Sequence, residues 1–283
     1  MVRSFTLWPV SSLSHAGGLA YRAAGSPSDP AVLLVHGYPE SSYMWHSVLP
    51  VLADAGWRAI APDLPGYGDS KPGESGTWEE HMQALQRFVS ELELGPVALV
   101  THDWGVPIGL RWACDHPGAV IALVISDGGF FSDRRWHDIA NLMRTPGEGE
   151  ELIRAYTRDG FAAAMQTVST GMSDQAIAEY WKAFADETRR LAQLALYRSG
   201  EFDKLLPYEG ALAKLDVPTL IVWGEQDRFA GVAMARRFHD EIPASELVIL
   251  EGAGHFVWDD QPERSARTLM DFLGRRVSQR NVS

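Results

Sequence analysis

The sequence predicts an α/β protein in which helices flank a mostly parallel central sheet and a helical segment is inserted. Two observations support this. Short apolar runs alternate along the chain with segments of helical period, and chemically versatile side chains directly follow the runs. A run that is apolar throughout is typical of a strand buried on both faces, as in a parallel sheet between helix layers. In such sheets, binding and catalytic groups collect in loops at the carboxyl ends of the strands.

The expected elements follow one another in a regular order. Strands are expected at 5–10, 18–25, 31–37, 58–63, 96–103, 120–126, 218–227 and 246–252. Helices are expected between and after them, at 41–54, 78–92, 108–116, 232–239 and 262–273. The polar residues that close the strands are His36, Asp63, Asp103, Asp127, Asp227 and His255. Parallel strands would bring these side chains to one edge of the sheet.

The strand rhythm stops in the middle of the chain. Segments such as FAAAMQTVSTGM and DQAIAEYWKAFADETRRLAQLALYRS are helical in character throughout. We therefore expect residues 1–128 and 214–283 to form one α/β core. Residues 129–213 are expected to form a helical cap over the carboxyl edge of its sheet.

Composition restricts the class of partner. The formal charge of −12, from 25 basic and 37 acidic residues, is unfavourable for nucleic acid or an anionic membrane. No apolar run approaches the roughly 18 residues of a membrane span, and the N-terminus lacks a signal-peptide pattern. Cys114 is the single cysteine, so no intramolecular disulfide can form. We expect a cytoplasmic monomer or homodimer that uses neither a metal nor an organic cofactor and acts on a small hydrophobic substrate and water.

The turn after the strand at 96–103 has the context of a nucleophile elbow. VTHDWG (100–105) lies between an apolar strand and a helix, where a sharp turn lifts one side chain into the site. Asp103 occupies the position that usually carries serine. A carboxylate is ionised at pH 7 and can attack an sp³ carbon without a general base, leaving an alkyl ester on the enzyme. A helix N-cap is the simpler alternative for this aspartate.

Two later motifs supply partners for Asp103. GAGHF places His255 in a glycine-bounded loop after the last strand, where it could activate water against the ester. WGEQD places Asp227 after the preceding strand, where it could accept the second imidazole N–H and fix the tautomer. Asp127 is an alternative acid. HGYP (36–39) could supply an oxyanion donor from the Tyr38 N–H, opposite the Trp104 N–H.

With these motifs, residues 15–274 resemble the haloalkane dehalogenase and epoxide hydrolase branch of the α/β-hydrolase superfamily. Both families share HG-x-P, HDWG and GH at these positions. The resemblance implies the α/β-hydrolase fold, with nucleophile, acid and histidine in that chain order. One dehalogenase branch places its acid where this chain has Asp127.

Several segments are similar to dehalogenases in particular: HGYPESSYMW, VTHDWG, FFSDRRW and EYWKAF. This similarity implies that the Trp104 indole N–H donates to a departing halide and that Trp136 borders the pocket. Dehalogenases commonly have an asparagine, a second halide donor, at the position of Tyr38. The chain also lacks their Phe-Pro after an arginine in the cap.

Other residues resemble epoxide hydrolases. An aromatic residue followed by glutamate, as in HGYPE, is typical of that family, whose cap tyrosines protonate the opening epoxide. Tyr197 in LALYRS is similar to the second of these, and Tyr156, or less well Tyr180, to the first.

Our preferred prediction is therefore a haloalkane dehalogenase-like hydrolase, and epoxide hydrolase is the alternative. In either case we expect His36, Trp136, Tyr156 and Tyr197 to line the substrate pocket. A ligand-binding protein without catalytic activity is a remote third possibility.

Overall fold

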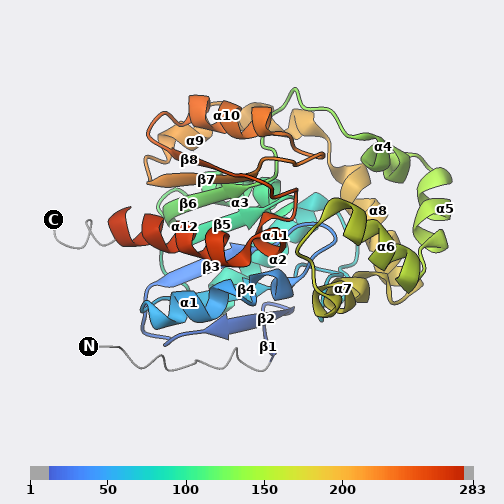
Figure 1. Ribbon diagram of the computed structural model, residues 1–283, viewed down its shortest axis with the longest axis horizontal. Helices are drawn as coiled ribbons and strands as arrows, with labels where there is room; N and C mark the ends of the chain where they lie inside the picture. The colour runs from blue at the N-terminus through green and yellow to red at the C-terminus, as the bar shows by residue number, and fades with distance from the viewer. Residues whose placement is uncertain (1–12, 277–283) are drawn as a thin grey trace.

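An eight-stranded sheet forms the centre of the computed structural model, which describes residues 13–276 (Figure 1). The strand order is β1-β2-β4-β3-β5-β6-β7-β8, and every pairing from β4 to β8 is parallel. The first two strands, β1 (Ser14–Ala16) and β2 (Leu19–Ala24), run antiparallel at one edge. The parallel strands are β3 (Ala31–Val35), β4 (Arg58–Pro62), β5 (Val97–His102), β6 (Val120–Ser126), β7 (Thr219–Gly224) and β8 (Glu246–Leu250). The predicted, mostly parallel α/β sheet is thereby confirmed.

The centre of the sheet is covered by helices on both faces, as its apolar runs predict. Every residue of β3 and β5 is buried, and the two strands pair in register from Val32 with Ala98 to Val35 with Thr101. Helix α1 (Val48–Asp54) packs against α12 (Pro262–Arg276) in front of the sheet in Figure 1, while α2 (Trp78–Glu91) packs against α3 (Gly105–Asp115). Helix α10 (Val232–Glu241) contacts β7 and β8, and α9 (Ala211–Lys214) contacts α3.

Helix α2 illustrates how local sequence sets one of these layers. Thr77 caps its N-terminus by accepting a hydrogen bond from the Glu80 N–H. Its buried residues recur at helical spacing, so that one face meets the core: Trp78, His81, Ala84, Leu85, Phe88 and Val89.

Between β6 and β7 the chain forms a series of helices that gather beyond one end of the sheet (Figure 1). We call residues 138–208 the cap segment. Its elements are α4 (Asp138–Arg144), α5 (Glu148–Ala155), α6 (Arg158–Val168), α7 (Asp174–Trp181), η2 (Lys182–Phe184), α8 (Glu187–Ser199) and η3 (Phe202–Tyr208).

Two hydrogen-bonded contacts tie the cap segment to the short helix α11 (Val257–Asp260). The Tyr180 hydroxyl donates to Asp259 Oδ2 at 2.8 Å, and the Thr170 N–H donates to Asp260 Oδ1 at 2.8 Å. Because α11 begins two residues after His255, these contacts hold the cap segment against the loop that carries the histidine.

One predicted helix differs from the structure, and one predicted strand lies outside the residues that the structure describes. The helix expected at 41–54 is interrupted: a 3₁₀ turn, η1 (Ser42–Trp45), precedes α1. Pro50 explains the break, because a proline ring clashes with the carbonyl four residues earlier and is tolerated in the first turn, where α1 places it. The strand expected at 5–10 lies outside the described residues. Within residues 13–276, no helix is long and apolar enough to cross a membrane.

Candidate active site

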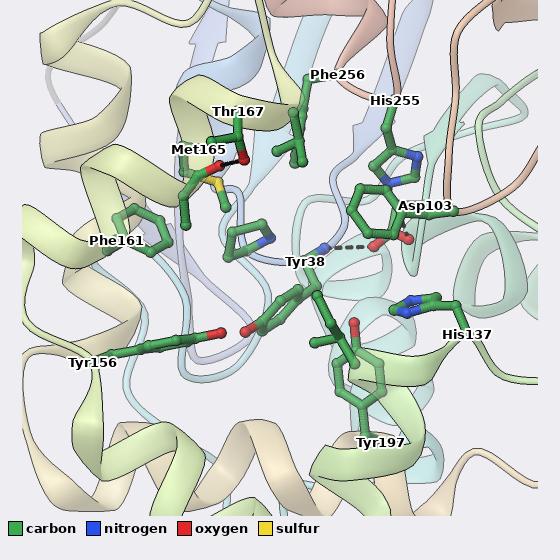
Figure 2. A pocket seen from close by; sticks show the side chains of 15 residues that line it. Tyr38, Asp103, His137, Tyr156, Phe161, Met165, Thr167, Tyr197, His255 and Phe256 are labelled. Carbon is green, nitrogen blue, oxygen red and sulfur yellow. Dashed lines mark hydrogen bonds and ion pairs between the residues drawn. The ribbon is translucent and has the colours of Figure 1, made fainter.

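Asp103 lies in a sharp turn between β5 and α3. Its φ of 45° is in the left-handed region, which few residues other than glycine, asparagine and aspartate adopt. The HGYP loop approaches this turn so closely that a Cβ on Gly37 would lie 2.4 Å from the Asp103 Cβ. The strand, the turn and the glycine together hold the carboxylate at the floor of a cavity (Figure 2).

His255 links the two aspartates predicted to work with it. Its Nε2 is 3.5 Å from Asp103 Oδ2, and its Nδ1 is 3.0 Å from Asp227 Oδ2. The other oxygen of Asp227 accepts hydrogen bonds from the backbone N–H groups of Phe229, at 2.7 Å, and Ala230, at 3.0 Å. These bonds fix the carboxylate, and the carboxylate in turn fixes the imidazole ring.

Charge separation within this triad follows from its geometry. Burial alone would raise the pKa of Asp103, but the hydrogen bond and charge of His255 outweigh burial and lower the pKa to about 2. Burial would lower the pKa of His255, but the charge of Asp227 and the hydrogen bonds that the ring donates to both aspartates raise it well above its usual value. Asp103 is therefore an ionised carboxylate beside a histidine that can hold a proton.

Asp127 has a different environment from Asp227. It follows β6 in the same left-handed conformation, but its Oδ1 accepts a hydrogen bond from the Gly224 N–H at 2.9 Å. Burial raises the pKa of its carboxyl well above the usual value, and the charge of Asp227 adds to this effect. Asp127 is thus an uncharged acid behind the triad, and the structure brings Asp227 to His255 instead.

A second neutral pair lies behind Asp103. Glu40 Oε2 is 3.4 Å from His102 Nε2, and both side chains are fully buried. Burial raises the pKa of Glu40 well above its usual value, helped by the charges of Asp259 and Asp103. Burial also lowers the pKa of His102 to about 3. Neither residue therefore adds charge to the floor of the cavity at neutral pH.

The backbone of the HGYP loop supplies a hydrogen-bond donor to Asp103. The Tyr38 N–H donates to Asp103 Oδ1 at 2.7 Å, at the position predicted for an oxyanion donor. Oδ2 is left facing His255. The two oxygens of the carboxylate are therefore distinct, because one is held by the backbone and the other lies beside the histidine.

The cavity in front of Asp103 has a volume of about 150 Å³. Its wall combines the carboxyl ends of the strands with α4, α6 and α8 of the cap segment and the turn after α5, and three tyrosines, Tyr38, Tyr156 and Tyr197, contribute to it (Figure 2). The remaining wall is mainly apolar. The full lining is Tyr38, Pro39, Asp103, His137, Ile139, Tyr156, Phe161, Ala164, Met165, Thr167, Val168, Tyr197, Phe229, His255 and Phe256.

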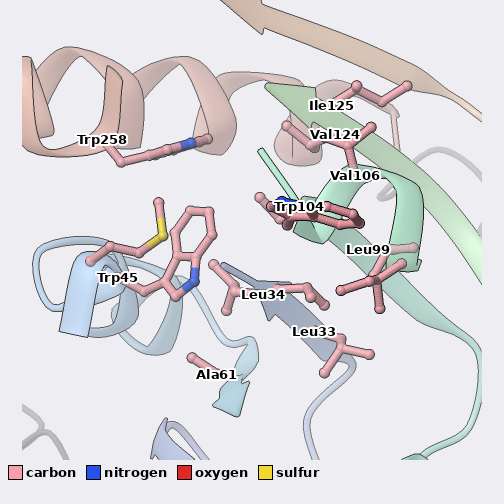
Figure 3. Close-up of a cluster of buried hydrophobic side chains, with 14 of the residues drawn as sticks. Leu33, Leu34, Trp45, Ala61, Leu99, Trp104, Val106, Val124, Ile125 and Trp258 are labelled. Atoms are coloured by element: carbon pink, nitrogen blue, oxygen red, sulfur yellow. The ribbon is translucent and has the colours of Figure 1, made fainter. Parts of the chain in front are cut away.

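Trp104, expected to donate to a departing halide, is not among the residues that line this cavity, although its ring packs against Tyr197, which is. Its side chain lies in the buried cluster with Leu99 and Val106 (Figure 3) and is 4% exposed. Its ring packs edge-to-face against Trp78, at 5.9 Å between centroids, and against Tyr197, at 5.4 Å.

Two further residues expected in the pocket lie outside it. His36 is fully buried, and both of its ring nitrogens are occupied by the backbone. Its Nδ1 contacts the Gly37 carbonyl at 2.8 Å, and its Nε2 accepts from the Leu64 N–H at 2.9 Å. The Trp136 ring packs against Phe202, with 4.4 Å between centroids, and its indole N–H donates to the Gly200 carbonyl. It also packs against the Trp104 ring, at 5.4 Å. Tyr180 is likewise buried against Asp259, so the cavity tyrosines of the cap segment are Tyr156 and Tyr197.

His137, Phe229 and Met165 line the cavity, although no motif identified them. His137 precedes α4 and directly follows the FFSDRRW segment, whose similarity to dehalogenases drew attention to Trp136 instead. Phe229 follows Asp227 closely enough that its place beside the histidine could have been inferred, and its ring lies 5.0 Å from that of His255. In the part of the chain that the structure describes, no three histidine, cysteine or acidic side chains are grouped to hold a metal ion.

Comparison with known proteins gives a consistent result. The family model for the alpha/beta hydrolase fold matches residues 30–262. A haloalkane dehalogenase of Mycobacterium marinum is 30% identical over 273 residues, covering 88% of this chain and 86% of that protein. The crystal structure of haloalkane dehalogenase DbeA from Bradyrhizobium elkani USDA94 is 28% identical, with a TM-score of 0.80 over 93% of this chain and 97% of that one. Epoxide hydrolase VrEH1 from Vigna radiata, at 21% identity and a TM-score of 0.78, covers 96% of this chain and 99% of that one and shares the fold.

Proposed function

Since this chain belongs to the alpha/beta hydrolase family, in the branch of haloalkane dehalogenases and epoxide hydrolases, and is a hydrolase, we propose that Asp103 is its nucleophile and a small haloalkane its substrate. The observation that best supports the nucleophile is the contact of His255 with both Asp103 and Asp227. The relatives named haloalkane dehalogenases support the proposal that a carbon–halogen bond is the bond cleaved.

In the first step, Asp103 Oδ2 attacks the carbon that carries the halogen. A C–O bond forms, the carbon–halogen bond breaks, and the halide leaves with the bonding electron pair. Oδ1 becomes the carbonyl oxygen of the ester and keeps its hydrogen bond from the Tyr38 N–H. No proton transfer is required, which agrees with the low pKa of Asp103.

In the second step, water attacks the ester carbonyl and passes a proton to His255. Ester formation removes the charge of Asp103, one of the influences that raise the pKa of His255, so the histidine can release its proton to the solvent and is then free to accept one from the attacking water. The Tyr38 N–H would stabilise the negative oxygen of the tetrahedral intermediate. Its collapse breaks the bond to the alkyl oxygen, which takes the proton back from His255 and leaves as the alcohol. The Asp103 carboxyl then ionises again, so that one proton is released for each halide.

Water could reach His255 by a route separate from the substrate cavity. A second pocket of about 110 Å³ touches the histidine and is more polar than the main cavity. It is bordered by side chains that include Gln166, Thr170, Gln226 and Arg228. Such a pocket could supply water while the main cavity is filled by the substrate, which must be small, since about 150 Å³ holds a ligand of the size of benzene.

Epoxide hydrolysis is a second candidate, favoured by the tyrosines in the cavity wall. Tyr197 lines the cavity, and its hydroxyl lies on the side of Asp103 in Figure 2. The Tyr38 ring packs edge-to-face against it at 5.2 Å, which adds a second phenol to the same wall. Two phenols near Asp103 suit the protonation of an opening epoxide, while the same hydroxyls could donate to a halide.

A paired assay with 1-bromobutane and 1,2-epoxybutane separates the two candidates, because the substrates share a carbon chain and differ in the leaving group. Bromide release without diol formation would support the dehalogenase. Diol formation without bromide release would support the epoxide hydrolase. Failure of both would contradict the proposal for these substrate classes.

Replacing each acid behind His255 tests which of them belongs to the triad. Asp227→Asn is expected to slow hydrolysis of the ester by at least about 100-fold, because the imidazole loses the charge and the acceptor that orient it. Asp127→Asn is expected to change turnover little, since an amide oxygen can still accept from the Gly224 N–H and no charge is lost. Steady-state rates with the better substrate would show this, and the opposite ranking would exclude Asp227.

A further inference from the structure

His137 brings a polar group into the cavity wall directly before the cap segment. Its ring points toward Asp103 and Tyr197 in Figure 2, and it packs edge-to-face on Phe229 with 5.1 Å between centroids. The rest of the wall contains few polar side chains, chiefly the three tyrosines, Thr167 and the catalytic pair. A histidine in such a wall is either structural or chemically active, and its hydrogen bonds distinguish the two.

The hydrogen bonding of His137 fixes its tautomer. The Ala140 N–H donates to its Nδ1 at 3.3 Å, so that the ring caps the N-terminus of α4. A nitrogen that accepts cannot carry a proton, so the neutral ring carries its proton on Nε2. Burial lowers the pKa of His137, which keeps the ring neutral at pH 7. Among residues 13–276, no side chain or carbonyl accepts a hydrogen bond from that Nε2–H.

The leaving group requires such a donor. Negative charge grows on the halide, or on the opening epoxide oxygen, as Asp103 forms the ester, and donors held in place stabilise that charge. The Trp104 indole lies in the buried cluster with Leu99 and Val106 and is not among the cavity-lining residues. Neither lysine nor arginine is among the cavity-lining residues. In Figure 2 the Tyr197 hydroxyl and the His137 ring both lie on the side of the wall that faces Asp103.

We propose that His137 donates from Nε2–H to the leaving group as Asp103 forms the ester, beside the hydroxyl of Tyr197. His137 thereby takes the part that the Trp104 indole was expected to play. This inference rests on the proposed function, because it concerns the first step of the same reaction.

Two substitutions separate the two nitrogens of the ring. The amide of asparagine reaches the position of Nδ1, so His137→Asn can still cap α4 but cannot donate to the leaving group. The amide of glutamine reaches the position of Nε2, so His137→Gln can donate but caps poorly. Ser173→Ala is the matched control, because Ser173 caps α7 through the Ala176 N–H at 3.1 Å and does not line the cavity.

The rate of ester formation is measured with each substitution in a His255→Ala background, by intact mass after mixing with 1-bromobutane or 1,2-epoxybutane. Asparagine is expected to slow ester formation by about 100-fold, as loss of one positioned donor does. Glutamine is expected to be clearly faster than asparagine despite a lower Tm. Ser173→Ala should lower the Tm and leave the rate unchanged.

Three outcomes would contradict the role of His137. Ester formation in His137→Asn at the rate of its parent would overturn it while leaving the proposed function intact. Equal slowing by asparagine and glutamine would show that ring shape matters, instead of donation, and would also overturn it. If the His255→Ala parent forms no ester with either substrate, the proposed function fails as well.

Discussion

Replacing Asp103 with asparagine is expected to abolish turnover and to leave the fold intact. Asparagine matches aspartate in shape and tolerates the left-handed backbone at this turn, with its φ of 45°. The Tyr38 N–H would keep an acceptor, but the nucleophilic charge would be lost. The rate should fall on the order of 10⁴-fold or more, as removal of a catalytic nucleophile does. Halide or diol release over time measures the loss, and urea unfolding checks the fold.

Asp127→Asn is the matched control for this substitution. Asp127 is also an aspartate with a φ of 45° at the end of a neighbouring parallel strand, and it differs in being neutral and in not lining the cavity. Retained turnover in Asp127→Asn, together with loss in Asp103→Asn, would assign the effect to chemistry. Appreciable turnover by Asp103→Asn, with an unchanged protein mass, would refute the aspartate nucleophile.

Replacing His255 with alanine is expected to stop the reaction after the ester on Asp103 has formed. Asp103 can still attack, because its oxygen needs no base, but water loses the group that accepts its proton. The protein should therefore accumulate as the ester, with a mass increase of one alkyl group, and release one equivalent of halide at most. Intact-mass measurement before and after digestion would place the added group on the peptide that contains Asp103.

His116→Ala is a suitable control for the histidine substitution. His116 lies at the end of α3, where its Nδ1 contacts the Trp112 carbonyl at 2.8 Å, and it does not line the cavity. That variant should turn over normally and show no added mass. An unmodified His255→Ala protein after long incubation with active substrates would contradict the covalent pathway.

The sheet could be predicted because a strand buried on both faces leaves a continuous apolar run, as AVLLV in β3 does. Asp103, Asp227 and His255 could be predicted because each directly follows such a run, so the strand determines where the residue lies. The division of the helix expected at 41–54 could also have been predicted, because the clash of the Pro50 ring with the carbonyl four residues earlier depends on the sequence alone.

The cavity wall could not be predicted in the same way. Trp104 follows the nucleophile, yet its indole is drawn into the core by Trp78 and Tyr197, which come from distant elements. His36 turns away because the Leu64 N–H needs an acceptor. His137 lines the cavity because α4 begins there, and nothing in its immediate sequence fixes that contact.

The uncharged groups behind the triad have a consequence for selectivity. Glu40, His102 and Asp127 contribute no charge, so the ionised groups of the triad are Asp103, Asp227 and the protonated His255. The Arg134 guanidinium, which does not line the cavity, acts on both aspartates from behind the wall. A carboxylate that enters would meet the like charge of Asp103 at the cavity floor, with no cation among the lining residues to replace its lost water. We expect 3-bromopropanoate to be turned over far more slowly than 1-bromobutane, as parallel bromide-release assays would measure. The enzyme would thus distinguish an organohalide from its oxidised, acidic derivative by electrostatic exclusion rather than by shape.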